Sequence, residues 1–266
     1  MKLGAGKGGT PLGLVASVFI ASSLLIFVPL IRSGESASTA VISLGICSGI
    51  SSAIAFWLFV NALKIGHYGF SVALLPMSSL VPVLFSIIFW KEAMGILKWV
   101  GIIFLSISIF LIACCGDSLA AGGKPLWIKW LLFMAGAFLL NGMAQISQAA
   151  VARIPVNSYF VFLFVNYLAG GILLFLFALA KRIGVDRHTV FWGTMGALGS
   201  ISGCFFTLKS LATFPEAVVF PISLGGPVIA GTLLSGIFFR ERINVYGYIG
   251  VFSGMAGITI LCIKSF

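Results

Sequence analysis

Charged side chains are scarce in this sequence. Only 8% of its 266 residues are Asp, Glu, Lys or Arg, whereas 60% are hydrophobic. Soluble globular chains are about 25% charged, so this composition excludes a soluble enzyme, a nucleic-acid-binding domain and a disordered chain. The mean hydropathy of +1.18 is far to the apolar side and also excludes a soluble chain. The sequence therefore predicts an integral multi-pass protein of the plasma or inner membrane.

Residues that bind metals or perform catalysis are also few. The chain has two histidines, and its five cysteines lie in apolar runs without a CxxC pair, so we expect no metal, no cofactor and no enzymatic activity. The net charge of +10 is expected at helix ends beside anionic headgroups, not on a nucleic acid. None of the six acidic residues lies in the middle of an apolar run. A neutral or zwitterionic ligand is therefore favoured over a hydrophobic cation.

Long apolar runs dominate the rest of the chain. They are continuous and about twice the length of a membrane β-strand, which favours helices over a barrel. We expect an all-α, polytopic transmembrane helix bundle of nine helices. Their approximate ranges are 11–31, 40–63, 68–90, 96–115, 126–150, 157–180, 189–211, 216–239 and 244–263.

An internal repeat links the two halves of the sequence. Pro76 and Pro82, six residues apart, recur at a constant offset as Pro221 and Pro227. The offset of 145 pairs stretches 40–63 and 68–90 with 189–211 and 216–239. After a four-residue insertion the offset becomes 149 and pairs 96–115 with 244–263, while 11–31 pairs with 157–180 at an offset of 150. Stretch 126–150 has no partner. Further matched landmarks are Lys91-Glu92 with Arg240-Glu241 and Gly101 with Gly250.

The repeat predicts two copies of opposite orientation, because an odd number of crossings separates equivalent helices. We expect a first repeat of four helices over 1–115, a linker at 116–125, and a second repeat of five helices over 126–266. Inverted repeats are typical of secondary transporters, in which interrupted helices place the substrate near the membrane midplane. The proline-containing stretches therefore predict site residues, namely Pro76, Ser79, Pro221 and Ser223.

The duplicated Pro, Lys/Arg-Glu and Gly landmarks resemble the EamA-type branch of the drug/metabolite transporter superfamily. The resemblance covers residues 1–263 approximately, in two copies. It implies ten helices in two inverted five-helix repeats, and transport of amino acids, nucleobases or other small metabolites. This sequence lacks the first of those helices. Because Met1 falls opposite Val151 at the end of stretch 126–150, we expect that the chain starts late.

Polar side chains inside the apolar stretches are the remaining site candidates. Asn141, Gln145 and Gln148 follow an i, i+4, i+7 spacing, which confines them to an arc of about 60° on one helix. Such residues are costly in hydrocarbon and usually face the protein interior. They line a cavity in one interpretation and stabilise helix packing by hydrogen bonds in the other. The same alternatives hold for Trp57, Asn61, Tyr159 and Asn166.

These patterns favour a secondary transporter that moves a small polar metabolite, amino acid or nucleobase-like, by alternating access. The alternative is a membrane protein that does not transport, such as an assembly partner or a truncated relic. In that case Asn141, Gln145 and Asn166 are expected to hydrogen-bond one another. The expected partners are a small-molecule substrate and the lipid bilayer, with no nucleic acid, and a homodimer is left open.

Overall fold

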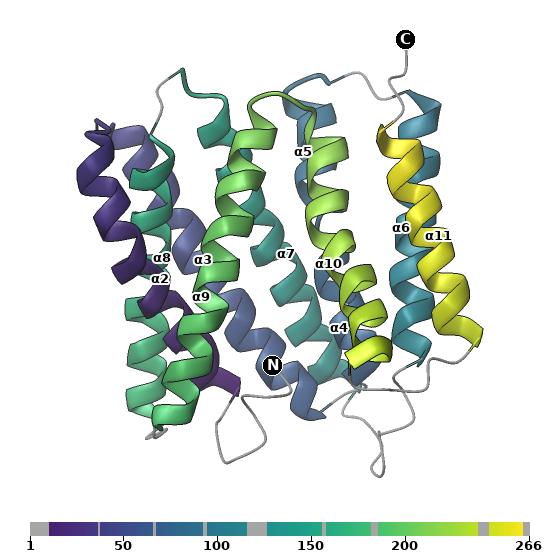
Figure 1. Cartoon of the computed structure of the whole chain (residues 1–266), viewed down its shortest axis with the longest axis horizontal. Helices are drawn as coiled ribbons and strands as arrows, with labels where there is room; N and C mark the ends of the chain where they lie inside the picture. Colours follow the sequence, from purple (N-terminus) through teal and green to yellow (C-terminus); the bar gives the residue numbers. More distant parts are fainter. Residues whose placement is uncertain are drawn as a thin grey trace. The chain divides into compact units, whose positions relative to one another are not determined.

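A computed structural model describes residues 11–36, 38–65, 68–92, 95–115, 127–155, 158–181, 186–238 and 245–262. Within these ranges all regular structure is helical and no strand occurs (Figure 1). The predicted all-α class is therefore confirmed. The helices are α2 (Pro11–Ser33), α3 (Thr39–Ile65), α4 (Tyr68–Met77), α5 (Leu80–Phe89), α6 (Ile96–Cys115), α7 (Trp127–Ala152), α8 (Tyr159–Ala180), α9 (Arg187–Leu211), α10 (Glu216–Phe238) and α11 (Val245–Cys262).

Five of these helices are long and apolar enough to cross a membrane by length and composition: α2, α3, α7, α8 and α9. Shorter apolar helical stretches occupy Leu74–Phe89, Ile96–Leu111, Glu216–Ala230 and Val245–Leu261. Every stretch that the sequence predicted as a membrane helix is thus helical over most of its length. The prediction of a polytopic helical membrane protein is confirmed.

One predicted helix is not continuous. The stretch 68–90, one of the two that the sequence marked as proline-interrupted, is divided into α4 and α5 at Ser78 and Ser79. The other, 216–239, forms the continuous helix α10 over its described residues. Pro82 lacks the N–H that would donate to Ser78 O in an α-helix. That carbonyl accepts from Val81 N at 3.0 Å instead, and the helix tightens locally into i→i−3 hydrogen bonds.

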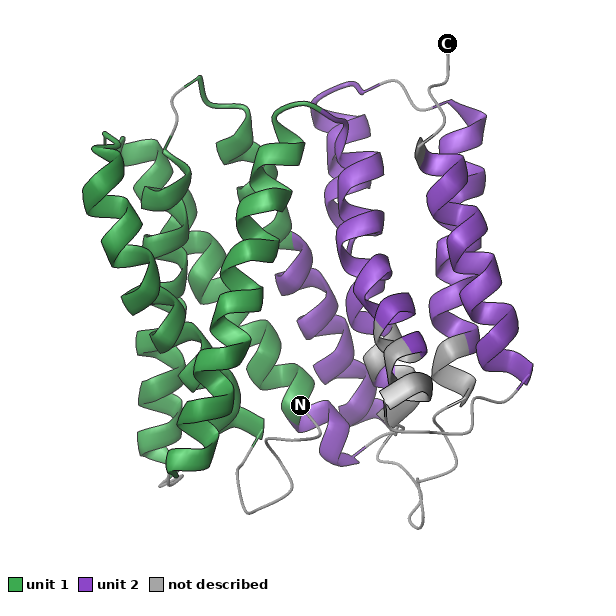
Figure 2. Cartoon of the chain, in the orientation of Figure 1, with its two compact units in different colours: residues 1–60, 143–213 green, residues 61–142, 214–266 purple. Residues whose placement is uncertain are grey.

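The helices form two compact units, which Figure 2 colours separately. Unit 1 comprises residues 1–60 and 143–213, and unit 2 comprises residues 61–142 and 214–266. Each unit contains helices from both predicted repeats: α2 with α8 in unit 1, and α6 with α11 in unit 2. The division of the chain into two repeats remains a prediction, because the compact units do not coincide with the predicted repeats at 1–115 and 126–266.

In unit 1, α2 and α8 pack closely through small residues and aromatic rings. A Cβ at Gly170 would overlap the ring of Phe19, and a Cβ at Gly49 of α3 would overlap the Asn166 carbonyl oxygen. The Phe19 ring also meets the Tyr167 ring edge-on, with centroids 5.5 Å apart. Small residues permit this close approach of membrane helices. Polar residues of α8 are consequently held deep inside unit 1.

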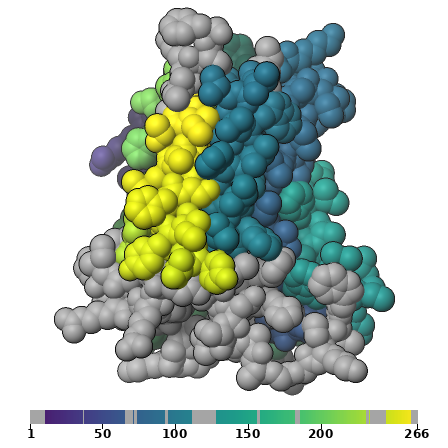
Figure 3. Space-filling model, turned by 90° about the vertical axis from the view of Figure 1, so that its right-hand side faces the viewer, coloured from purple at the N-terminus to yellow at the C-terminus, as the bar shows by residue number. Residues whose placement is uncertain are grey.

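In unit 2, α6 and α11 pack along their length (Figure 3, α11 in yellow beside α6 in blue). A Cβ at Gly257 would lie 2.9 Å from Gly101 O and 3.0 Å from Leu105 N. The backbones of the two helices are therefore in contact there. Only a residue without a side chain fits at Gly257 without displacing α6.

The contacts between α6 and α11 follow the predicted repeat. The offset that pairs Gly101 with Gly250 also pairs Phe104 with Ser253, and the Ser253 hydroxyl donates to Phe104 O at 3.0 Å. Contact between equivalent residues is what a local two-fold relation produces. A second pair of contacts is reciprocal: Ser108 contacts Gly254, and Leu105 contacts Gly257. In the repeat, Ser108 is equivalent to Gly257 and Leu105 to Gly254.

Candidate functional site

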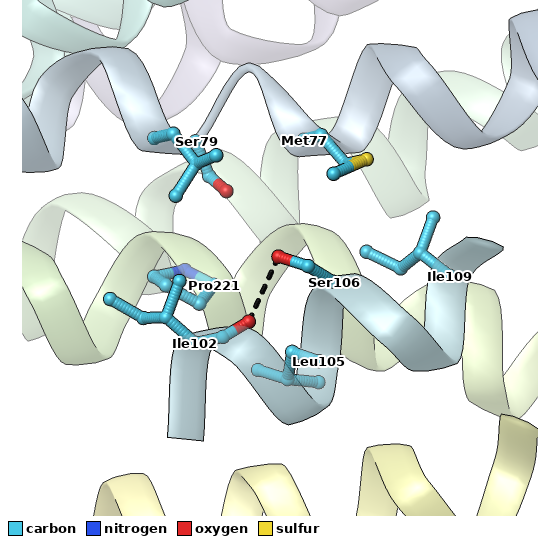
Figure 4. A pocket seen from close by; sticks show the side chains of 8 residues that line it. Met77, Ser79, Ile102, Leu105, Ser106, Ile109 and Pro221 are labelled. Atoms are coloured by element: carbon cyan, nitrogen blue, oxygen red, sulfur yellow. Dashed lines mark hydrogen bonds between the residues drawn. The ribbon is translucent and has the colours of Figure 1, made fainter. Parts of the chain in front are cut away.

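The division between α4 and α5 lines a small pocket in unit 2 (Figure 4). Ser79 and Pro221, which the sequence predicted as site residues, both line it. The Ser106 hydroxyl also lines the pocket and donates to Ile102 O at 2.9 Å. The pocket has a volume of about 10 Å³, which is enough for about one water molecule. It marks the interrupted helix but is too small in this conformation for a metabolite.

Asn141 of α7 lies against the same interruption. Its amide nitrogen donates to Ser78 Oγ at 2.7 Å, so the first residue of the predicted polar stripe is bonded to the turn between α4 and α5. The neighbouring Gly142 allows close contact, because a Cβ there would overlap the side chain of Val81. The structure thus brings Asn141 to the same turn that contains Ser79.

A second polar cluster lies within unit 1. The Tyr167 hydroxyl is 2.7 Å from Ser200 Oγ and donates to Cys204 Sγ at 3.3 Å. The side chain of Gln148, from the α7 stripe, is a further hydrogen-bond partner of Cys204. Side chains of α7, α8 and α9 are therefore joined in one network of uncharged groups.

Two predicted site residues in unit 1 are buried amides. Gln145 is 6% exposed and Asn166 is 7% exposed. The Oδ1 atom of Asn166 has no hydrogen-bond partner among the described residues. A buried acceptor without a donor costs about 1–3 kcal/mol. Asn166 therefore offers an acceptor that the described part of the chain does not use.

The other predicted site residues have different surroundings. Trp57 packs on Phe177 with ring centroids 5.5 Å apart, and Lys181 Nζ lies 5.2 Å from the Trp57 ring centroid. The Ser223 hydroxyl donates to Phe220 O within its own helix. The remaining three are half-buried: Tyr159 in unit 1, and Asn61 and Pro76 in unit 2. The Pro76 carbonyl oxygen accepts from Ser79 N at 3.1 Å, next to the pocket.

Acidic side chains stand at helix starts outside the membrane-spanning segments. Glu35 Oε2 accepts from Phe160 N at 2.8 Å and Val161 N at 3.1 Å, which holds the first turn of α8. Partial burial raises the pKa of Glu35, against the lowering effect of these two bonds. Asp186 caps α9 by accepting from Thr189 N at 2.9 Å, and this bonding lowers its pKa.

Within the described residues, no group of three or more His, Cys, Asp or Glu side chains could hold a metal ion. The polar clusters consist of hydroxyl, amide and thiol groups. Such groups bind an uncharged polar molecule by hydrogen bonds and supply no acid–base pair for catalysis.

Three residues of these clusters do not stand out in the sequence: Ser106, Ser200 and Cys204. Serine and cysteine are common in membrane helices, so their types alone carry no signal. The i, i+4 spacing of Ser200 and Cys204 on one helix is the pattern that could have marked them as a pair. Their common partner Tyr167 becomes visible only when α8 and α9 are packed.

Apolar helices of membrane-spanning length with polar residues inside them define this protein as a polytopic membrane protein. Residues 3–114 match the model of the EamA-like transporter family. The resemblance to EamA-type transporters is confirmed by this match, which covers the first expected repeat. A family of membrane transporters is thereby indicated.

Two known proteins are similar over longer parts of the chain. An uncharacterized protein of Haemophilus influenzae is 21% identical over 187 residues, which are 70% of this chain and 63% of that relative. The chain thus spans less than two thirds of the relative's length. A protein of known crystal structure matches 96% of this chain and 88% of its own, with a TM-score of 0.78 and 14% identity. This likeness supports the fold.

Proposed function

We propose that this protein is a secondary transporter that moves a small, neutral or zwitterionic polar metabolite across a plasma or inner membrane by alternating access. The family match supports transport as the general activity. The substrate class is inferred from Asn166 and from the polar side chains of the two clusters, which are amides, hydroxyls and a thiol. An amino acid or a nucleobase-like molecule has the donors and acceptors that such groups bind.

The observation that carries the proposal is the buried Asn166. In a protein that only packs its helices, a buried amide is expected to find its partners within the fold. Asn166 Oδ1 has none among the described residues, although the side chain is 7% exposed. An acceptor retained at this cost is suited to a donor N–H or O–H of a bound solute.

The non-transporting alternative expected Asn141, Gln145 and Asn166 to be paired with one another. For Asn141 and the Asn166 oxygen the structure differs from that expectation. Asn141 donates to Ser78, and the Asn166 oxygen is left unbonded within the described chain. The unbonded Asn166 oxygen favours a ligand site, whereas the Asn141–Ser78 bond joins α7 to the turn between α4 and α5.

Solute binding is tested by the thermal unfolding midpoint of the purified protein in detergent. Neutral amino acids and nucleobases at millimolar concentration are expected to raise the midpoint, because a ligand of the folded state stabilises it. Organic cations and dicarboxylates are expected to leave it unchanged. Asn166→Leu should abolish the shift while the midpoint without solute stays equal or rises, since an unbonded polar atom is removed.

The matched control is Ser202→Ala, whose exposed hydroxyl donates to Leu198 O in the same helix. This variant should retain the solute-induced shift. A shift that persists in Asn166→Leu would remove Asn166 from the site, and a shift produced by cations alone would contradict the proposed substrate class.

A further inference from the structure

Two proline-containing segments with the same spacing adopt different structures in unit 2. Pro76 and Pro82 flank the division between α4 and α5, whereas Pro221 and Pro227 lie inside the continuous helix α10. A proline removes one backbone hydrogen bond and its ring crowds the preceding turn. Since α10 tolerates the same two prolines, proline alone does not explain the interruption.

Helix propensity alone predicts that the second copy, not the first, is interrupted. The residues between the prolines are Met77-Ser78-Ser79-Leu80-Val81 in the first copy and Ile222-Ser223-Leu224-Gly225-Gly226 in the second. Glycine is the residue that weakens a helix most after proline, by about 1 kcal/mol each relative to alanine. The copy with two glycines nevertheless stays helical, so a tertiary contact must decide the difference.

The contact that distinguishes the copies is the one with Asn141. Ser78 and Ser223 are equivalent in the repeat, but their hydroxyls are used differently. Ser78 Oγ accepts from Asn141 Nδ2 at 2.7 Å, whereas Ser223 Oγ donates to Phe220 O at 3.2 Å in its own helix. The close approach of Gly142 to Val81 keeps α7 against the turn.

We propose that Asn141 is a positioning residue that does not contact the substrate. It acts on transport through its hydrogen bond to Ser78, which holds the turn between α4 and α5 in place; we call this bond the latch. The inference rests on the proposed transport function. The turn lines the pocket of unit 2 through Met77 and Ser79, so its conformation sets the shape of that pocket. When the Asn141–Ser78 bond breaks, the segment between Pro76 and Pro82 can adopt a continuous helical conformation, like that of the equivalent segment in α10.

A double-mutant cycle tests the latch without any substrate. Asn141→Leu and Ser78→Ala should each lower the thermal unfolding midpoint by a few degrees, and the double variant should fall no further than the larger single effect. Ser223→Ala is the matched control, whose effect should add to that of Asn141→Leu. Additive effects of Asn141→Leu and Ser78→Ala would overturn the latch.

Transport kinetics then separate positioning from substrate contact. Asn141→Leu, Ser78→Ala and the double variant should lower the maximal rate by the same factor, up to about tenfold, with KM unchanged, as loss of one hydrogen bond allows. Ser78→Thr, which keeps the hydroxyl, should restore the rate. A raised KM with an unchanged rate in Asn141→Leu alone would show substrate contact and overturn the proposal. Failure of the unaltered protein to transport any solute, with the coupling intact, would refute the transport function and leave the latch in place.

Discussion

Glu35 joins the loop after α2 to the start of α8. Because its pKa is raised above the ordinary value of 4.5 by burial, the folded protein holds the proton to higher pH than the unfolded chain. Stability from this group is therefore present at low pH and is lost as the pH rises from 4.5 through the raised pKa. Glu35→Gln keeps an acceptor oxygen for Phe160 N and Val161 N without the titration.

The expected outcome is that Glu35→Gln gains stability relative to the unaltered protein as the pH is raised from 4 to 7. The measurement is the difference between the two thermal unfolding midpoints at each pH, so that other titrating groups cancel. Parallel pH profiles would show that burial of Glu35 contributes nothing to stability.

At the same scale, the sequence identified amides better than hydroxyls. Asn141, Gln145, Gln148 and Asn166 stand out because an amide inside an apolar helix is rare and costly, and all four are at least partly buried in the structure. Ser200 does not stand out, since a serine can satisfy itself by donating to its own helix. Its importance depends on a partner from another helix, Tyr167.

At the scale of elements, the tight packing of α6 on α11 makes Gly257 the most sensitive position of that pair. A methyl group at this site would lie 2.9 Å from Gly101 O, and a backbone carbonyl cannot move away as a flexible side chain can. Gly257→Ala should therefore lower the free energy of unfolding by about 1–3 kcal/mol, the usual cost of overpacking.

The control for this prediction is Gly199→Ala in α9, where a Cβ would meet nothing within 4 Å. That change should be neutral or stabilising by about 0.5–1 kcal/mol, because alanine favours helix more than glycine. Unfolding by denaturant in micelles measures both. Equal effects of the two substitutions would mean that the contact of α6 with α11 does not determine stability.

Helix positions could be predicted because long apolar runs allow only one regular structure in a bilayer. The paired prolines marked 68–90 and 216–239 alike as interrupted, but only the first is divided, whereas α10 is continuous. The sequence shows the same pair of prolines in both copies. It does not show that Asn141 bonds to Ser78 of the first copy. Tertiary contacts, which propensity does not include, decided this element.

At the scale of the whole molecule, the repeat and the compact units describe different features. The repeat predicted which helices are equivalent, and equivalent helices turned out to be packing partners, as α6 and α11 are through Phe104 and Ser253. The assignment of α3 and α7 to both units could not be read from the sequence, since it depends on contacts between distant segments.

The central claim, that the chain transports a small uncharged polar metabolite, is tested most directly by counterflow in liposomes containing the purified protein. Vesicles preloaded with an unlabelled neutral amino acid or nucleobase are incubated with a trace of the labelled compound, and its accumulation is followed over time. The account predicts transient accumulation with the unaltered protein, loss of at least about tenfold with Asn166→Leu, and little change with Ser202→Ala. Accumulation no greater than in protein-free vesicles for every neutral or zwitterionic solute would contradict the claim.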